Sequence, residues 1–301
     1  MKLRMVCAVL SMILIAASAF FLSTRGLNLG VDFAGGGVIE FEQTEATTTE
    51  AVRNAMPLQA DVNTATGTGV DAKTATSLEE DKQLDFAQSY TTDLVRNTLI
   101  EEFGLKKEDF LRTDSVGPKV SGELFKAGIT ALGVALALML LYIAFRFEWR
   151  FSVGAVAALV HDVFITMGMF SLLQMEFNLT TIAALLTIIG YSMNDTVVVF
   201  DRVREEKRKY KKMPDRDVIN LALNGTLSRT LLTSGTTLLA LLAIFVLGGP
   251  VLRGMSFALI WGVIIGTYSS IFIASSIVLL LGLDLDRKPV EGVPGFGQAD
   301  G

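Results

Sequence analysis

The chain lacks most of the side chains from which cross-links and metal sites are built. Among its 301 residues are one cysteine, Cys7, and one histidine, His161. A single cysteine excludes an internal disulfide and a thiolate metal cluster, and a single histidine excludes an H-E-x-x-H zinc site. We therefore expect this chain to bind no metal and no cofactor.

The motifs of nucleotide-driven and hydrolytic enzymes are also missing. The sequence contains no G-x-x-x-x-G-K-[ST] loop and no G-x-S-x-G nucleophile elbow. Residues 67–72 imitate a dinucleotide-binding fingerprint, but no firm strand precedes them and no helix follows, which favours a loop. The chain is not expected to be an enzyme, and energy for any transport must come from an ion gradient or from a partner.

Charged residues are scarce and unevenly placed. They make up 19% of the chain, against 51% hydrophobic residues, and leave long stretches without charge. Acidic residues dominate between Asp32 and Glu123, and basic residues dominate between Arg202 and Lys212. This asymmetry is a signal of membrane topology and does not indicate a nucleic-acid partner.

Six apolar runs approach or exceed the length needed to cross a membrane. About 20 apolar residues in a helix span the ~30 Å hydrocarbon core of a bilayer. The sequence therefore predicts an α-helical polytopic membrane protein with one sizeable water-exposed domain between its first two spans. The predicted spans are residues 5–22, 124–145, 151–173, 179–200, 230–247 and 255–281.

The first run has two interpretations. Lys2 and Arg4, followed by an apolar stretch and the small residues 17–19, are typical of a cleavable signal peptide. However, residues 20–22 are Phe, Phe and Leu, which continue the apolar run past the small residues. This continuation favours a retained anchor, so residues 1–23 are assigned to the first transmembrane helix.

Basic residues cluster at one end of the predicted spans. They flank the first span, the turn between the second and third, the connection between the fourth and fifth, and the end of the sixth. The positive-inside rule then places both termini in the cytoplasm and residues 24–123 outside. The remaining predicted segments are a five-helix region at 124–285, which contains a basic cytoplasmic loop at 201–228, and a cytoplasmic tail at 286–301.

The segment between the first two spans has the pattern of a small α+β domain. Ile39 and Phe41 alternate with polar residues, as in a half-buried strand, and residues 110–116 are predicted as another strand. A capping box predicts a helix at 47–56, and helical spacing predicts a second helix at 91–103.

The order of these elements suggests a known arrangement. With weak strands in the middle, the order is β-α-β-β-α-β, which indicates a ferredoxin-like extracytoplasmic domain. Gly104 is predicted to cap the second helix. Residues 58–77, rich in threonine, alanine and glycine, are predicted to be flexible.

Asp195 is the main candidate for chemistry inside the membrane. A carboxylate near the centre of a span costs about 2.5–3.5 kcal/mol on insertion scales, so it must face protein, a partner or water. Low polarity also favours the neutral form of a carboxyl group, so Asp195 could bind and release a proton. The alternative is a structural carboxyl group that joins helices through hydrogen bonds.

For three other ionisable residues, a functional and a structural interpretation both stay open. Arg229 opens the fifth span and is the candidate cationic partner of Asp195, although it could instead anchor the helix at the interface or pair with Asp201. His161 and Asp162 lie midway through the third span, where they could relay protons or join helices.

The last two spans carry many small and hydroxyl-bearing residues. Packing between helices is the default interpretation of such surfaces, and the hydroxyl groups could instead line a transient file of water. The residues are Thr230, Thr233, Ser234, Thr236 and Thr237 in the fifth span, and Gly262, Gly266 and Ser270 in the sixth.

Taken together, several motifs resemble the SecF family, the smaller subunits of bacterial SecDF protein-export complexes, which are relatives of the RND transporters. The resemblance covers nearly the whole chain, and its most specific part is residues 190–205, GYSMNDTVVVFDRVRE. The residues that carry it include Gly30, Asp32, Gly35 and Gly36 after the first span, Gly117 and Pro118 before the second, His161 and Asp162, and Gly190, Asp195, Asp201 and Arg229.

The resemblance implies a role in protein export. Family members join SecD and assist the SecYEG translocon, using the proton-motive force to complete translocation of the preprotein. It implies that Asp195 and Arg229 are important for proton flow; Asn194, Asp162 and His161 are added as further candidates for the path. The proton is then the coupling ion, the location is the bacterial inner membrane, and the partners include membrane lipid and YajC-like and YidC-like proteins.

A mechanism follows from this resemblance. Protonation of Asp195 would weaken its attraction to Arg229 and permit the fourth and fifth spans to shift, and the spans that flank the outer domain would carry the shift to it. Two alternatives stay open: half of an RND-type efflux permease, which the single outer domain disfavours, and a translocase scaffold that conducts no protons.

Overall fold

The computed structural model describes residues 4–41, 47, 52 and 80–283. Six helical segments in it are long and apolar enough to cross a membrane, as the sequence predicted. They are α1 (Arg4–Thr24), α7 (Pro118–Arg146), α8 (Trp149–Leu173), α9 (Leu179–Lys209), α10 (Asp215–Leu247) and a last span composed of α11 (Gly249–Ser269), the π-helix η2 (Ser270–Ala274) and α12 (Ser275–Leu281).

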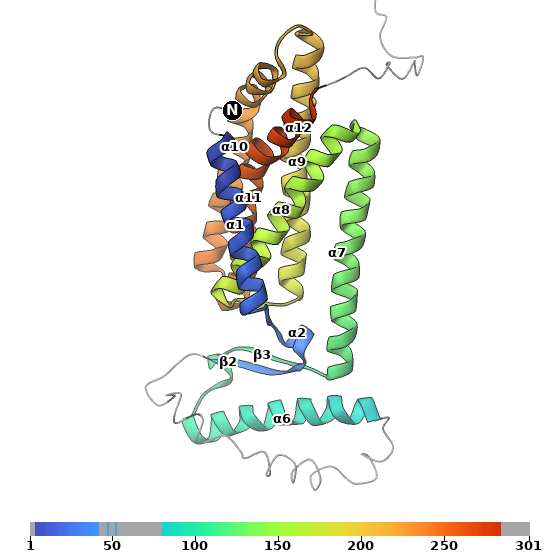
Figure 1. Cartoon of the computed structure of the whole chain (residues 1–301). Helices are drawn as coiled ribbons and strands as arrows, with labels where there is room; N and C mark the ends of the chain where they lie inside the picture. Colours follow the sequence, from blue (N-terminus) through green and yellow to red (C-terminus); the bar gives the residue numbers. More distant parts are fainter. Residues whose placement is uncertain (1–3, 42–46, 48–51, 53–79, 284–301) are drawn as a thin grey trace, which may run out of the picture.

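The spans form a bundle with a buried centre and an exposed rim. In the most apolar parts of α8 and α9, 56% of the residues are buried, against 11% in α1, α7 and α10. α1 packs on α8, α10 packs on α9 and α11, and α7 stands at one side of the bundle (Figure 1). The three rim helices therefore present most of their apolar surface to lipid or to a partner.

Small residues of the last span serve packing inside the chain. Gly262 and Gly266 of α11 face Ile188 and Ser192 of α9, and a side chain on Gly262 would collide with Ile188. This confirms the packing interpretation for the two glycines. α1 also packs on the bundle, where its residue Ser18 is buried.

The predicted loop at residues 201–228 is wrong. α9 continues to Lys209 and α10 begins at Asp215, so that residues 210–214 alone connect them. Hydropathy identifies the stretch that lies in lipid, whereas arginine, lysine and glutamate are good helix formers that extend a helix into water. Most of the basic segment is consequently a helical extension of α9 and α10.

The domain between α1 and α7, here called the interspan domain, contains the two predicted strands. β2 (Gly36–Phe41) and β3 (Phe110–Val116) pair antiparallel, with Gly36 opposite Val116. α6 (Glu80–Phe103) packs across this pair and lies crosswise to the spans (Figure 1).

The helix predicted at 91–103 is therefore confirmed, although it begins earlier, at Glu80. Gly104 follows it with a φ of 65°, and its N–H donates to the carbonyl of Ile100, as predicted for a cap. The predicted helix at 47–56, the middle strands and residues 58–77 lie outside the described residues, apart from Thr47 and Val52. The complete ferredoxin-like order thus stays a prediction.

A short junction between the interspan domain and the spans was not predicted. β1 (Asn28–Leu29) pairs in parallel with β4 (Glu176–Phe177), which lies in the connection between α8 and α9. The next element, α2 (Val31–Ala34), contains Asp32, whose Oδ2 accepts a hydrogen bond from the N–H of Leu179 at 2.9 Å. Asp32 thereby caps the first turn of α9.

Gly117 and Pro118 connect β3 directly to the span α7. β3 ends at Val116, Gly117 precedes the helix in an extended conformation, and Pro118 occupies the first turn of α7. Proline suits this position because its missing N–H would have no partner there. α7 therefore rises directly from the interspan domain without a flexible linker.

Arg112 of β3 joins the interspan domain to the α8–α9 connection. Its Nη1 donates to Oε2 of Glu176 at 3.1 Å, and its Nε donates to Asp114. Burial lowers the pKa of Arg112, but hydrogen bonds and charge attraction from Asp114 and Glu176 outweigh burial and raise the pKa above its usual value. Arg112 therefore keeps its charge, and this link depends on the carboxylates.

Candidate functional site

Asp195 lies inside the bundle, as predicted, with 8% of its surface exposed. Its Oδ1 accepts a hydrogen bond from Thr230 Oγ1 of α10 at 2.7 Å, and its Oδ2 accepts one from Ser270 Oγ at 2.6 Å. Two hydroxyl groups from two other spans thus satisfy the carboxylate.

Asp162 of α8 is a second buried carboxylate, with 0% exposed. Its Oδ2 accepts hydrogen bonds from Ser192 Oγ at 2.6 Å and Ser269 Oγ at 2.7 Å. Its Oδ1 lies 3.0 Å from Nδ1 of His161. Asp162 lies 13 residues from the start of α8 and 11 from its end, so it sits near the middle of the span.

The two carboxylates meet the last span where its helix changes type. α11 ends at Ser269, and the π-helix begins at Ser270. Consecutive residues of a helix point about 100° apart, so the two serines reach different neighbours. Ser269 reaches α8 and Ser270 reaches α9. Short π-helical segments occur frequently at functional sites.

His161 extends the network to α1. Its Nε2 lies 3.2 Å from Ser11 Oγ, and Ser11 lies 2.9 Å from the hydroxyl of Tyr268. Tyr268 in turn donates to the carbonyl of Cys7 at 2.6 Å. Since α1 leads directly into β1 and α2, the network connects the centre of the bundle to the helix that enters the interspan domain.

Arg229 does not contact Asp195 in this structure. It is exposed, and it forms no ion pair or side-chain hydrogen bond with the part of the chain that the structure describes. The adjacent Thr230 makes the contact instead, because neighbouring helix positions point in different directions. Arg229 does not pair with Asp201 either, whose carboxylate accepts from Arg146 at 2.8 Å.

Several other residues that were candidates for the proton path or for packing lie on the exposed side of the α9–α10 pair. The two helices are joined by a short turn and run antiparallel, and they touch where Thr230 meets Asp195 and Tyr191 meets Ser234. In an antiparallel pair of helices, the residue that precedes a contact residue on one helix and the residue that precedes a contact residue on the other helix point to the same side of the pair. These positions are Gly190 and Asn194 of α9 and Arg229 and Thr233 of α10; with Thr236, which lies three residues after Thr233 on the same face of α10, they form an outer polar face.

The bonding of the two carboxylates suits a group that gains and loses a proton. Within the described residues, no lysine or arginine forms an ion pair with Asp162 or Asp195. A hydroxyl group can donate to a carboxylate and can rotate to accept from a protonated carboxyl group. Both forms of Asp195 can therefore form hydrogen bonds with these hydroxyl groups, although the hydroxyl hydrogens must point differently in the two forms.

Sequence reasoning found the two carboxylates and missed most of their partners. Thr230 and Ser270 were interpreted as packing residues, and Ser11, Ser192, Ser269 and Tyr268 were not considered. A usable signal was present, because Ser and Thr side chains inside spans form hydrogen bonds between helices. Which carboxylate each one meets depends on how the helices are rotated, and this is a property of the packed bundle.

Comparison with known proteins agrees with this architecture. The family described as "Protein export membrane protein SecD/SecF, C-terminal" matches residues 96–284, and the family described as "SecD/SecF GG Motif" matches residues 20–43. Six spans, an interspan domain entered through a glycine-rich junction and buried carboxylates thus define a membrane protein of the SecD/SecF class.

Curated relatives define the family more narrowly. The protein translocase subunit SecF of Cereibacter sphaeroides is 48% identical over 282 residues, which cover 91% of this chain and 86% of that protein. The SecF subunit of Rhodobacter capsulatus is 44% identical, with 97% of this chain and 92% of that protein covered. The chain belongs to the SecF family of protein translocase subunits. It is a membrane protein of protein transport and not an enzyme.

Two solved structures share the fold. The crystal structure of SecDF from Thermus thermophilus, titled a translocon-associated membrane protein, has a TM-score of 0.73 and 34% identity. A SecDF structure in a super-membrane-facing form has a TM-score of 0.65 and 35% identity. Each comparison covers 93% of this chain and 38% of the solved chain, so this chain corresponds to well under half of those proteins.

Proposed function

We propose that this chain is one subunit of a SecDF-type complex that uses the proton-motive force to promote preprotein translocation through the Sec channel. The observation that carries the proposal is the hydroxyl-bonded Asp195 in the centre of the bundle, which can be satisfied with and without a proton. The translocase subunits and the translocon-associated SecDF named above support the transport role.

A SecD-like subunit is the proposed partner at the outer polar face. Arg229, Asn194 and Thr233 are exposed polar residues within two helices that are long and apolar enough to span a membrane. Polar and charged side chains facing lipid are costly, so a second membrane protein or an internal water path has to cover them. The part of the solved SecDF chains that this chain does not match is long enough to supply such a half.

The proposed setting is the bacterial inner membrane, with both termini in the cytoplasm and the interspan domain outside. The motivation is the charge distribution, because the end of α9 and the turn that follows it are rich in lysine and arginine. We also propose a complete ferredoxin-like fold for the interspan domain, with SecYEG, the preprotein and YajC-like and YidC-like proteins as further contacts.

Proton binding would act through the hydroxyl network. A proton that crosses ~180 mV releases roughly 4 kcal/mol, which exceeds the 1–3 kcal/mol typical of coupling between two sites. Protonation of Asp195 would reorient Thr230 and Ser270, and so change the contacts of α9 with α10 and η2. Arg229 would exert its influence from the outer polar face, across the boundary with the partner.

Two routes could transmit such a change to the interspan domain. One runs from Asp162 through His161 and Ser11 to α1. The other runs through the α8–α9 connection, where Glu176 pairs with Arg112. Both lead to the β2–β3 pair of the interspan domain.

The proposal is tested by depletion and partner analysis. Membrane vesicles from cells depleted of this chain should lose the part of preprotein export that a proton uncoupler abolishes, and re-expression should restore it. The chain, affinity-purified from native membranes, should bring a larger SecD-like protein with it. A complex that stimulates export equally with and without the uncoupler would support a scaffold instead.

A further inference from the structure

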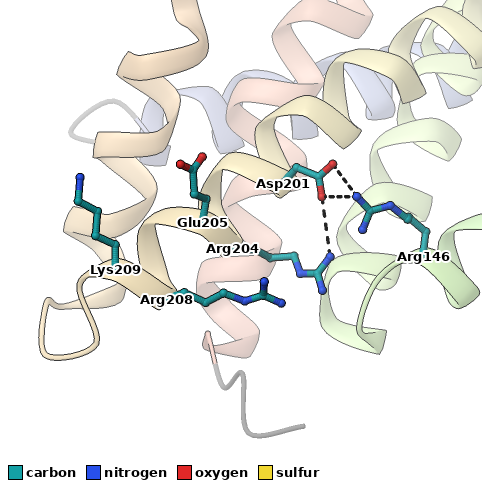
Figure 2. Close-up of a pocket in the computed structure, with 6 residues that line it drawn as sticks. All are labelled: Arg146, Asp201, Arg204, Glu205, Arg208 and Lys209. Atoms are coloured by element: carbon teal, nitrogen blue, oxygen red, sulfur yellow. Dashed lines mark hydrogen bonds and ion pairs between the residues drawn. The ribbon is translucent and has the colours of Figure 1, made fainter. Parts of the chain in front are cut away.

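A hollow opens at the end of the bundle where α7 and α9 meet. Its volume is about 680 Å³, and side chains of both helices line it (Figure 2). Four of the six lining residues are basic, and the other two are acidic. The lining residues are Arg146, Asp201, Arg204, Glu205, Arg208 and Lys209.

Both carboxylates of the hollow already have cationic partners. Arg146 donates to the two oxygens of Asp201 at 2.8 Å each. Glu205 accepts from Arg202, which is not part of the lining, at 2.7 Å. A third carboxylate, Glu148, lies in the short turn that follows α7. Arg146 therefore pairs with Asp201, and Arg202 is shared between Glu205 and the buried Glu206.

Arg204 and Arg208 retain donors without partners. Nε of Arg204 is buried and makes no hydrogen bond, and its nearest carboxylate contact, to Asp201, is 3.8 Å long. Arg208 is exposed and forms no ion pair within the described ranges. Figure 2 shows the guanidinium groups of both residues extending in the same direction, toward Arg146.

An aromatic ring holds two of the cations in place. The ring of Phe147 lies 4.9 Å from the guanidinium carbon of Arg146 and 5.5 Å from that of Arg204. Phe147 itself is buried, with 5% exposed. Stacking on a fixed ring reduces the freedom of both side chains, so the donors are partly preorganised before any anion arrives.

The hollow lies at the level where a lipid headgroup would be. α7 ends at Arg146, and its neighbour Phe145 is 86% exposed, as is 57% of Trp149 at the start of α8. Exposed aromatic residues at the end of a span are typical of the membrane interface. Basic pockets between spans at this depth suit anionic headgroups.

We propose that this hollow binds the phosphate group of an anionic phospholipid through Arg204 and Arg208, with Lys209 as a further cation in the lining. A guanidinium group matches phosphate oxygens with paired N–H donors. The acyl chains would lie along the apolar surface of α7 beside Phe145. Free phosphate shares the recognised chemistry but has no acyl chains, so the two sources can be separated by experiment.

The test uses the complete chain in its purified membrane complex, in detergent. Dioleoyl-phosphatidylglycerol or dioleoyl-phosphatidylcholine is added, and bound lipid is counted by native mass spectrometry. The Arg208→Gln/Lys209→Gln variant should lower phosphatidylglycerol affinity by about tenfold or more. Lys211→Gln/Lys212→Gln removes two exposed charges just outside the hollow and should change the affinity less than threefold or so. Arg204→Gln, deeper in the hollow, should also weaken binding.

Each other result overturns the assignment. Equal affinity for the two lipids, or equal losses in the two double variants, would mean that only diffuse charge attracts lipid. Displacement by millimolar inorganic phosphate, with equal affinity for phosphate alone, would identify free phosphate as the source. If phosphatidylglycerol bound the isolated chain but not the complex, an acidic segment of the partner would occupy the hollow.

Discussion

Ser269 and Ser270 are neighbours in the chain, yet each donates its hydroxyl hydrogen to a different buried carboxylate. Ser269 bonds to Asp162 at 2.7 Å and Ser270 bonds to Asp195 at 2.6 Å. The change from α-helix to π-helix falls between them. A change of protonation at either carboxylate therefore alters a hydrogen bond at the junction of α11 and η2. This junction is a candidate for coupling Asp162 to Asp195.

The two serines should differ in importance. Ser270→Ala leaves Asp195 with Thr230 alone, whereas Ser269→Ala leaves Asp162 with Ser192 and His161. An unmade hydrogen bond to a buried polar group costs about 1–3 kcal/mol. We expect Ser270→Ala to reduce uncoupler-sensitive export several-fold more than Ser269→Ala, measured in vesicles at matched protein levels. Equal effects would indicate that the serines serve general packing.

The ion pair between Arg112 and Glu176 should matter for coupling more than for stability. A partly exposed pair contributes only about 0.2–1 kcal/mol, so Glu176→Gln should leave the protein folded and assembled. If the pair carries movement to the interspan domain, export should fall at least twofold or so, and amide exchange in β3 should become faster.

Glu108→Gln is the matched control for that experiment. Glu108 is an exposed carboxylate of the interspan domain, and no hydrogen bond or ion pair is found for it among the described residues. The Glu108→Gln substitution removes one charge and leaves the ion pair between Arg112 and Glu176 in place. A loss of export in both variants would show that only the net charge of the domain matters.

Gly36 should resist replacement by a branched residue. Its φ is 122°, a conformation that residues with a side chain rarely adopt, and it opens β2 opposite Val116. Gly36→Val should lower export while membrane insertion stays normal. Gly133→Val is the control, since Gly133 lies on the exposed side of α7 with open space around it. Unchanged export at normal protein levels would argue against a mechanical role for the junction.

The orientation of the chain can be read with reporter fusions. Fusions at Lys209 and at the C-terminus should report the cytoplasm, and a fusion at Gly69 should report the outside. The reason is the concentration of basic residues at the end of α9, where Lys207, Arg208 and Lys209 occupy the last turn. An external signal at Lys209 would reverse the proposed topology and also the side on which the phospholipid site lies.

The sequence predicted what depends on composition along the chain. The six spans follow from apolar length, and the strand that contains Ile39 and Phe41 follows from alternation, so both match the structure. The β1–β4 pair was not predictable, because two strands of two residues carry no periodic signal. Their pairing depends on the approach of segments about 150 residues apart in the chain, which the bundle imposes.

In the candidate site, too, only the features that depend on composition along the chain were predictable. Asp195 was identified because a carboxylate inside a span is rare and costly. Arg229 was named as its candidate partner, whereas in this structure the next residue, Thr230, bonds to it. One position is about 100° of helix rotation, and rotation is set by contacts with other spans. The resemblance to a two-subunit family fits this outcome, because the outer polar face would be completed only by a second chain.

The sharpest test separates a proton-driven motor from a scaffold. Asp195→Asn keeps the size of the side chain, and its amide can still bond to Thr230 and Ser270, but it cannot bind and release a proton. The variant should assemble normally and lose the export that a proton uncoupler abolishes. Asp217→Asn, at an exposed position in the first turn of α10, removes the same charge and should have no effect. Arg229→Lys keeps the charge but not the planar guanidinium group, so partial loss is expected. If Asp195→Asn retains full uncoupler-sensitive stimulation, Asp195 is structural, and Asp162, the other buried carboxylate, becomes the next residue to replace.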